Sequence, residues 1–390
     1  MPWKGQTMEG QRNEFVRRVQ AREKSKSALC REYGISRPTG DKWIARSEAG
    51  ETMADRSRAP FRTPHRILGE MEATIVSLRR KHPAIGAKKL KRMLENQGLS
   101  APAYSTINAV LHRNGLILPE ASAAATPHIR FEKKRPNEMW QADFKGHFAM
   151  GNGQRCHPLT VVDDHSRYCI CLAALNDERL EGVRRCLLQA FDAYGLPDTI
   201  LCDNGNPWGT VQSTGYTRFE AWLWDLGVLV KHGRIRHPQT QGKNERFNGS
   251  LLRERIRYRS FEDYLAAQQD FDDYRSFYNH ERPHHSLDLK TPSDRYSPSP
   301  RKLPSKIKDW EYGHGELVRQ VKPSGYLTFR GQGYFLSEPL ANKSVAIVES
   351  QQEKEVFLVL YRQFCIAKLN ITSRVVIAKS PFRFSYASIP

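Results

Sequence analysis

The sequence predicts an α/β core built on a mixed sheet flanked by helices, preceded by all-α helix-turn-helix units and followed by a small all-β domain. Three observations support this prediction. Apolar residues recur at helical spacing up to about residue 115, and strand and helix patterns alternate between residues 136 and 296. After residue 313, short β-type runs are separated by glycines. The 390 residues are enough for several domains, one of them with a full α/β core.

The formal net charge of +19 is distributed unevenly along the chain. Residues 1–135 carry 27 basic and 13 acidic side chains, residues 136–300 carry 20 and 22, and residues 301–390 carry 14 and 7. Basic flanks around a near-neutral core are typical of a protein whose flanks bind a polyanion. The charge distribution therefore predicts nucleic acid as a partner.

The sequence contains no run of 18 apolar residues and no signal-peptide core. Its seven cysteines include no C-x-x-C pair. We therefore expect a cytoplasmic protein in a reducing environment, without membrane contact and without a structural zinc site of common spacing.

Residues 1–60 are predicted to form a helix-turn-helix domain. Ser27 and Ser36 are expected to cap the second and third helices, and Gly34 to supply the turn between them. The alternative is a plain three-helix bundle with a basic surface. If the domain binds DNA, three side chains of the third helix should face the major groove: Arg37, Thr39 and Lys42.

Residues 61–120 repeat this pattern and predict a second helix-turn-helix domain. Lys88 and Lys89 lie on the polar side of its middle helix and are expected to contact DNA, and Ser105 is expected to cap its last helix. A single six-helix structural domain is the alternative interpretation. Residues 121–135 are predicted to be a linker, rich in alanine at first and basic at its end.

The predicted core, residues 136–296, begins with a strand in which polar and apolar side chains alternate from Trp140 to Phe148. Asp143 lies on the polar face of this strand, and Asn152-Gly153 predicts a hairpin turn. The following elements are expected in this order: strands at 157–162 and 167–175, a helix at 177–194, a strand at 199–202, a helix at 216–226, a strand at 228–231, a helix from 243 and a helix at 261–278.

Three carboxylates of the core occupy positions where active sites occur in α/β proteins. Asp143 lies on a strand face, Asp203 at the end of a short apolar strand, and Glu245 in a first helical turn. If they converge, their repulsion raises their pKa values unless a cation neutralises them, and magnesium suits an all-oxygen site of this kind. Asp163 and Asp164 form a rival pair, but their neighbours favour a turn.

Five motifs occur in one order along the core. They are Trp140–Phe144, Asp163–Arg167, Cys202–Gly205, His237–Arg246 and Tyr278–Leu287. This ordered set resembles the integrase-core (DDE) transposases of bacterial insertion sequences, which are relatives of retroviral integrases. The resemblance implies a ribonuclease-H-like core, and it implies that Asp143, Asp203 and Glu245 are catalytic metal ligands. Two Mg²⁺ ions per site, replaceable by Mn²⁺, would support DNA strand cleavage at element ends and strand transfer into target DNA.

The resemblance also implies double-stranded DNA partners, a homo-oligomer on DNA and a nucleoid-associated protein. Residues around the glutamate are then expected to lie along the DNA: His237, Gln241, Lys243, Arg246 and Arg253. Members of this family usually carry a basic residue seven positions after the glutamate, whereas this chain has Leu252 there. Two alternatives remain: a DNA-binding regulator with an inactive integrase fold, and a ribonuclease-H-like nuclease without transposition.

The carboxyl-terminal part is predicted as a linker at residues 297–312 and a small β-barrel-like domain at residues 313–390. Four strands are expected in this domain, at 326–330, 334–336, 345–348 and 356–361. The domain is basic, and its sequence leaves open whether it binds DNA or joins protomers.

Overall fold

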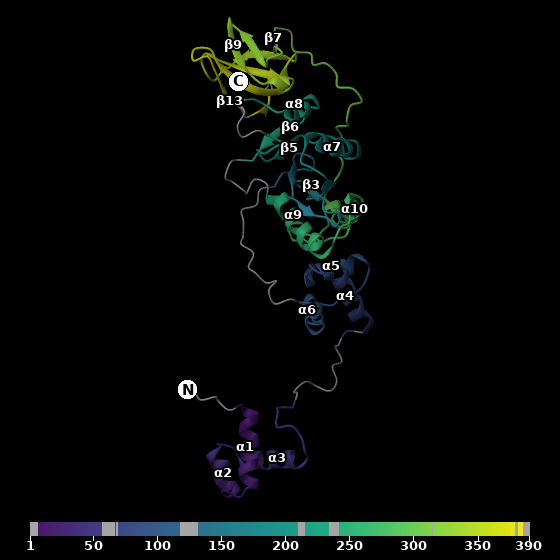
Figure 1. Cartoon of the computed structure of the whole chain (residues 1–390), viewed down its shortest axis with the longest axis vertical. Coiled ribbons are helices and arrows are strands. Elements are labelled where there is room, and N and C mark those ends of the chain that lie inside the picture. Colours follow the sequence, from purple (N-terminus) through teal and green to yellow (C-terminus); the bar gives the residue numbers. More distant parts are fainter. Residues whose placement is uncertain are drawn as a thin grey trace. The chain divides into compact units, whose positions relative to one another are not determined.

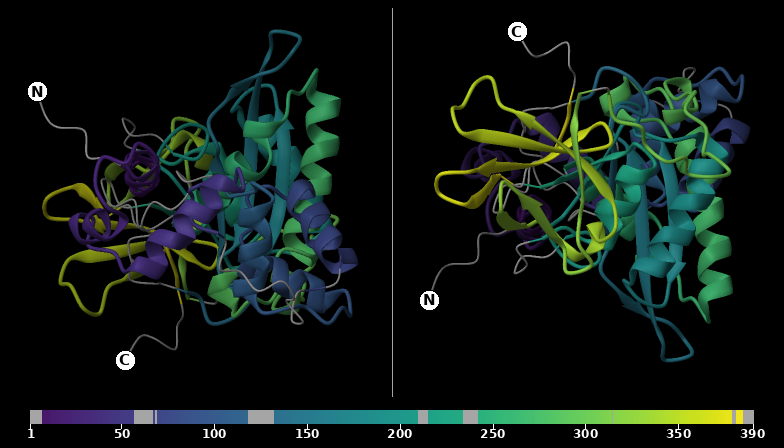
Figure 2. Two further views of the ribbon diagram at one scale, coloured as in Figure 1. Left: turned by 90° about the horizontal axis from the view of Figure 1, so that it is seen from below. Right: turned by 90° about the horizontal axis from the view of Figure 1, so that it is seen from above.

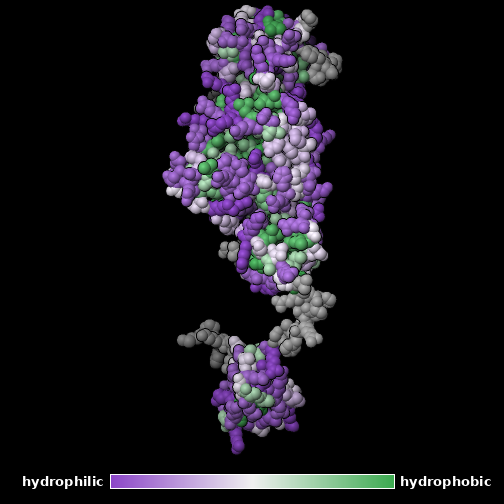
Figure 3. Space-filling model, turned by 90° about the vertical axis from the view of Figure 1, so that its right-hand side faces the viewer, coloured by the Kyte–Doolittle hydropathy of each residue, from purple (hydrophilic) through white to green (hydrophobic). Residues whose placement is uncertain are grey.

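The structure is a computed structural model. It describes the following residues: 7–56, 67, 69–117, 132–209, 215–233, 242–313, 315–378 and 381–384. The chain divides into two compact units, Met1–Ile67 and Leu68–Pro390, whose elements are labelled in Figure 1. Among the described helices, none is both long and apolar enough to span a membrane. Hydrophilic residues cover most of the face shown in Figure 3.

The first unit holds α1 (Met8–Gln20), α2 (Lys26–Glu32) and α3 (Arg37–Glu48). Ser36 caps α3 by accepting a hydrogen bond from the Thr39 amide, and Gly34 has a φ of +64° in the turn before it, so both predictions are confirmed. The predicted cap Ser27 is wrong, because α2 starts two residues earlier and Ser25 accepts from the Ala28 amide.

Close packing in the first unit depends on Gly40. A Cβ at this position would lie 2.8 Å from Cys30 Sγ and 3.1 Å from the Phe15 ring. Both neighbours are buried in the core of the unit, together with Trp43. Gly40 therefore allows α3 to approach α1 and α2 closely.

The second unit begins with α4 (Gly69–Lys81), α5 (Ala87–Asn96) and α6 (Tyr104–Arg113). Ile75, Leu90 and Val110 are among the residues they bury. Ser105 does not cap α6, because the helix begins one residue earlier and Ala103 occupies the cap position. After α4, the His82 ring stacks on Phe277 of α10 (Tyr264–His280), with ring centroids 4.1 Å apart.

The central sheet has the strand order β4-β3-β1-β5-β6, with the short β2 paired to the start of β3. β1 is antiparallel to β3 and parallel to β5, and β5 is parallel to β6, so the predicted mixed sheet is confirmed. The strands are β1 (Trp140–Phe144), β2 (Phe148–Ala149), β3 (Arg155–Asp163), β4 (Cys169–Leu175), β5 (Thr199–Cys202) and β6 (Leu229–His232). The continuous strand predicted from residue 140 to 148 is wrong, because Gly146 adopts a φ of +83° between β1 and β2.

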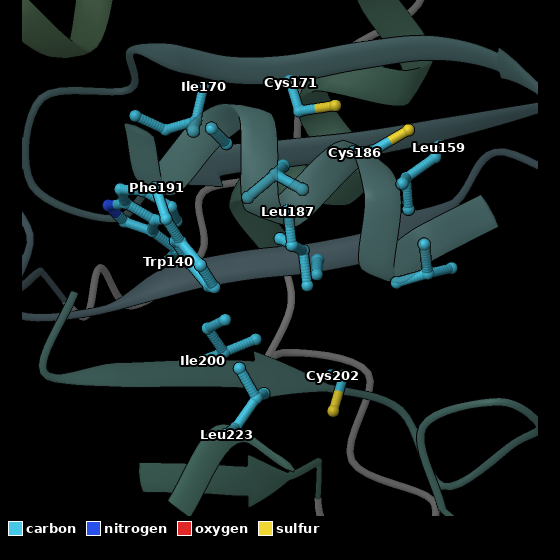
Figure 4. Packing of buried hydrophobic residues seen from close by; sticks show 14 of the residues in the cluster. Trp140, Leu159, Ile170, Cys171, Cys186, Leu187, Phe191, Ile200, Cys202 and Leu223 are labelled. Carbon is cyan, nitrogen blue, oxygen red and sulfur yellow. The ribbon is translucent and has the colours of Figure 1, made fainter. Parts of the chain in front are cut away.

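Helices cover both faces of this sheet. They are α7 (Leu180–Tyr194), α8 (Arg218–Asp225), α9 (Gly242–Glu254) and α10 (Tyr264–His280). Trp140 packs on Phe191 of α7, with ring centroids 5.8 Å apart, in the apolar cluster shown in Figure 4. The next residue, Gln141, contacts Asn244 of α9 instead. Because successive strand residues face opposite sides, α7 and α9 lie on opposite faces of the sheet.

The carboxyl-terminal region is all-β, as predicted. Its strands are β7 (Leu317–Gln320), β8 (Tyr326–Phe329), β9 (Gln332–Phe335), β10 (Ser344–Glu349), β11 (Val356–Tyr361), β12 (Phe364–Asn370), β13 (Val375–Ala378) and β14 (Phe382–Arg383). The main sheet has the order β13-β12-β11-β10-β7, with β14 on β12, and β8 pairs with β9. The sequence had indicated only β8 to β11.

These β-strands share a hydrophobic core with α8 and with residues next to it in the sequence. Tyr216 and Trp224, before and on α8, are buried in one cluster with Leu327 and Val359 of the β region. Asp225 of α8 accepts a hydrogen bond from Lys343 Nζ at 2.7 Å. The strands accordingly lie beside α8 in Figure 1, and the yellow strands lie beside the teal part of the chain in both views of Figure 2.

Candidate active site

The pairing of β1 with β5 brings Asp143 and Asp203 together. In this parallel pair, Trp140 lies opposite Ile200 and Gln141 opposite Leu201, an offset of 60 positions. Asp143 and Asp203 are separated by the same offset, so the continued register sets them side by side. Asp143 is on β1 and Asp203 follows β5 directly, at the carboxyl ends of these parallel strands, where open α/β proteins place their active sites.

Glu245 lies in the first turn of α9, and this turn is fastened to the sheet by Asn244. The Asn244 amide donates to Gln141 Oε1 at 3.2 Å, and its side-chain Nδ2 lies 3.3 Å from the carbonyl oxygens of Gln141 and Thr160. Thr160 Oγ1 donates to Asn244 Oδ1 at 3.1 Å. A fully buried side chain thus fixes the start of α9 over β1 and β3, next to Asp143.

The pKa of Asp143 depends on its burial and on nearby charged residues. The pKa of Asp143 is raised to about 6, first by burial, then by the negative charge of Asp203 and, more weakly, by that of Glu245. Asn248, one helical turn after Glu245, donates from Nδ2 to Asp143 Oδ2 at 3.0 Å. Sequence reasoning missed Asn248, although its spacing of three residues from Glu245 placed it on the same helix side.

The three carboxylates supply oxygen ligands of the kind that Mg²⁺ prefers. Across the described ranges, no three His, Cys, Asp or Glu side chains already form a cluster that could hold a metal ion. Glu245 is exposed, so its side chain is free to rotate, whereas Asp143 is partly buried in β1. The donor chemistry and the raised pKa of Asp143 fit a divalent cation.

The turn that carries Asp203 is shaped by Gly205. Its amide donates to Asp203 Oδ1 at 3.0 Å, and a Cβ at this position would lie 3.3 Å from Asp203 Oδ2. A larger residue would therefore crowd the carboxylate that the turn presents.

The rival carboxylates serve local structure. Asp163 Oδ1 accepts from the Ser166 amide at 2.8 Å and closes the predicted turn. Asp164 is buried and pairs with Lys243 Nζ at 2.6 Å. Lys243, which the sequence placed along the DNA, therefore neutralises a buried charge beside the start of α9.

The other residues predicted to contact DNA have varied surroundings. Arg37 and Lys42 on α3 and Arg246 and Arg253 on α9 are exposed. Thr39 Oγ1 lies 2.8 Å from Ser36 Oγ at the helix cap. His237 and Gln241 lie outside the described residues.

The two lysines of α5 differ from each other. Lys88 is exposed, with its Nζ 5.3 Å from the centre of the Tyr104 ring. Burial lowers the pKa of Lys89 to about 8, and the positive charge of Arg282 acts in the same direction. Arg282 itself forms an ion pair with Glu254 at the end of α9, so Lys89 faces the end of the helix that carries Glu245.

Comparison with known protein families places the site in a recognised domain. Residues 133–238 and residues 226–292 each match a family model described as an integrase core domain. The chain resembles the integrase-core transposases of bacterial insertion sequences. Residues 39–111, from α3 to α6, match a homeodomain-like domain. Asp143, Asp203 and Glu245 all lie within the integrase-core matches.

Similar proteins come from several bacteria. The chain is 27% identical over 281 residues to an uncharacterized 31.7 kDa protein of insertion element IS407 from Burkholderia multivorans, covering 69% of this chain and 90% of that protein. It is 23% identical over 246 residues to the transposase InsD of insertion element IS2 from Escherichia coli, covering 59% of this chain and 75% of that one.

Solved structures of viral integrases are also similar to part of the chain. The HTLV-2 integrase catalytic core domain in complex with magnesium has 18% identity and a TM-score of 0.33, covering 42% of this chain and 97% of that one. The simian T-cell lymphotropic virus intasome in complex with PP2A regulatory subunit B56 gamma has 17% identity and a TM-score of 0.36, covering 75% and 96%.

Proposed function

We propose that this protein is a DNA transposase that cleaves DNA at element ends and transfers the ends into target DNA with the help of divalent metal ions. The observation that carries the proposal is that Asp143 and Asp203 meet at neighbouring parallel strands within a match to the integrase core. The negative charge of Glu245 also contributes to raising the pKa of Asp143. The resemblance to insertion-sequence transposases supplies the substrate class.

Asp143, Asp203 and Glu245 are the residues that would hold Mg²⁺, or Mn²⁺ in its place, as two ions per site. When bound, such ions activate an attacking oxygen and stabilise the leaving oxygen of a phosphodiester. Water attacks first and leaves a free 3′-hydroxyl at the element end. That 3′-hydroxyl then attacks a target phosphodiester, whose own 3′-oxygen leaves with the displaced strand. No covalent intermediate with the protein is needed.

The chain's own side chains have separate tasks in this scheme. Asn248 orients Asp143 through the bond to Oδ2. Arg246 and Arg253 are exposed on the helix that carries Glu245, where they can contact DNA phosphates. Arg37 and Lys42 on α3 are proposed to contact the element ends in the major groove.

Assembly is part of the proposal. Two element ends must be held near one target, so the protein is proposed to act as a homo-oligomer on double-stranded DNA in the bacterial nucleoid. The basic amino-terminal region supplies the electrostatic attraction for this binding.

The decisive experiment is a strand-transfer assay with labelled element ends, Mg²⁺ and supercoiled target DNA. Asp143→Asn, Asp203→Asn and Glu245→Gln should each abolish cleavage and joining while end binding persists. Asp272→Asn, on the exposed side of α10, is the matched control and should remain active. Binding without cleavage by the wild type would indicate a regulator, and cleavage without joining would indicate a nuclease.

A further inference from the structure

A histidine binds the backbone carbonyl of Asp203, and a glutamate binds the histidine. His232, the last residue of β6, has its Nδ1 2.7 Å from the carbonyl oxygen of Asp203. Its other ring nitrogen, Nε2, lies 3.2 Å from Glu220 Oε1. Three residues that are distant in sequence thus form one continuous hydrogen-bonded row that ends at a proposed metal ligand.

The direction of the first bond follows from its acceptor. A main-chain carbonyl only accepts hydrogen bonds, so His232 Nδ1 carries a hydrogen and donates a hydrogen bond to the carbonyl oxygen of Asp203. Nε2 faces a carboxylate oxygen that is fixed in place. The ring is therefore oriented at both nitrogens, and so is the carbonyl that it binds.

Glu220 has little freedom to move. It is only 5% exposed, and its second oxygen, Oε2, accepts from the Thr217 amide at 2.7 Å and lies 3.0 Å from Thr217 Oγ1. These contacts form the capping box at the start of α8. One oxygen of Glu220 therefore anchors the helix, and the other anchors His232.

The backbone at Gly209 packs against the His232 ring and restricts its position. A Cβ at Gly209 would lie 3.1 Å from His232 Cε1 and 3.3 Å from Nδ1, so the ring occupies the space that a side chain would need. In the parallel pair of β5 and β6, His232 lies opposite Cys202, the residue before Asp203. This register places His232 next to Asp203, whose carbonyl it binds.

We propose that His232 and Glu220 are positioning residues that set the orientation of Asp203 for metal binding. This inference rests on the proposed function, because it treats Asp203 as a metal ligand. Partners that orient a metal ligand typically contribute about 10–100-fold to metal affinity. Loss of the His232 bond to Asp203 should therefore weaken metal binding without removing a ligand.

Two amide substitutions separate this role from a purely structural one. In His232→Asn, the side-chain amide nitrogen replaces Nδ1, so the donor to Asp203 is retained and the contact with Glu220 is lost. In His232→Gln, the amide nitrogen replaces Nε2, so the contact with Glu220 is retained and the donor to Asp203 is lost. Both variants are neutral and similar in size, so each is the control for the other.

The experiment titrates Mn²⁺ into the full-length protein and follows the melting temperature, with isothermal calorimetry as a second readout. The Mn²⁺ concentration that gives half of the maximal rise in melting temperature should increase about tenfold or more in His232→Gln. It should remain within about threefold of the wild-type value in His232→Asn. Equal values in the two variants, or the reverse order, would overturn the inference.

Further variants distinguish the possible failures. Asp203→Asn should show little or no Mn²⁺ response; if wild type and Asp203→Asn respond alike, the proposed metal site fails. If only Asp203→Asn loses the response and His232→Gln behaves as wild type, the positioning role alone fails. Should both His232 variants unfold, Gly209→Ala takes their place: its Cβ would lie 3.1 Å from His232 Cε1 and displace the ring, so an unchanged Mn²⁺ response would refute the positioning role.

Discussion

Replacing Asp143 by asparagine should stabilise the metal-free protein at neutral pH. Asparagine has nearly the same shape and can still accept the hydrogen bond that Asn248 donates, but it carries no charge. The wild-type carboxylate is partly buried and repelled by Asp203 and Glu245, and these influences raise its pKa from 3.8 to about 6. The substitution removes an unfavourable charge while the packing stays the same.

The magnitude follows from the pKa difference between the folded and unfolded states. Each pKa unit corresponds to about 1.4 kcal/mol, so a rise of about two units costs the wild type up to about 3 kcal/mol once Asp143 is ionised. Because the folded pKa is the higher one, the wild type is relatively most stable below pH 4 and loses this stability as the pH rises towards 6. The advantage of Asp143→Asn should grow over the same interval and then stay constant.

Thermal unfolding in EDTA between pH 4.5 and 8 measures this effect. For a unit as large as Leu68–Pro390, the gain corresponds to a rise in melting temperature on the order of 4 °C at pH 8. Added Mg²⁺ should stabilise the wild type and not the variant, which reduces the difference. The exposed Asp309 gives the matched control Asp309→Asn, which should show no such pH-dependent gain.

The reasoning fails if Asp143→Asn gives no stabilisation at pH 8. It also fails if the gain is the same at pH 4.5 and pH 8, because the stabilisation would then have a cause other than the charge of Asp143.

Three further predictions concern packing and DNA binding. Gly40→Ala should destabilise the first unit by roughly 1–3 kcal/mol in chemical denaturation because its Cβ would meet Cys30 Sγ; an unchanged midpoint would contradict this. Trp224→Ala should lower the unfolding free energy of the second unit by about 3–5 kcal/mol, and a loss below 1 kcal/mol would show that the shared core is not stabilising. Arg37→Ala with Lys42→Ala should weaken end binding and reduce the slope of log affinity against log salt by about 2; an unaltered slope would remove these residues from the DNA contact.

The sequence predicted the elements that carry the carboxylates, because each element depends on local patterns. The short apolar run before Asp203 is β5, and the polar face of the strand at Trp140 holds Asp143. What brings the two together is the register between β1 and β5. That pairing joins residues 60 positions apart, and no local pattern encodes it. The family resemblance supplied this link before the structure showed it.

Other features lay beyond sequence reasoning for a related reason. The pattern of α5 showed that Lys89 is on a polar face, but not that this face lies against Arg282. Tyr216 and Trp224 belong to the helix predicted at 216–226, and nothing in that prediction indicated that they are buried against the β region. Likewise, His232 and Glu220 belong to different elements, and only the fold brings them into contact. Periodicity identifies a face of an element and does not identify its partner.

The shared core has a consequence for the order of events during synthesis. Trp224 is covered by strands that extend to Leu369, 145 residues further along the chain. At a synthesis rate of roughly 5–20 residues per second, α8 waits for about 7–30 s before its covering strands leave the ribosome. The helix that holds Glu220 therefore reaches its final packing only after the strands up to Leu369 have been synthesised. A chain interrupted before the β-strands would keep its three carboxylates and lack the support behind Asp203, so strand-transfer activity is expected only from chains that include these strands.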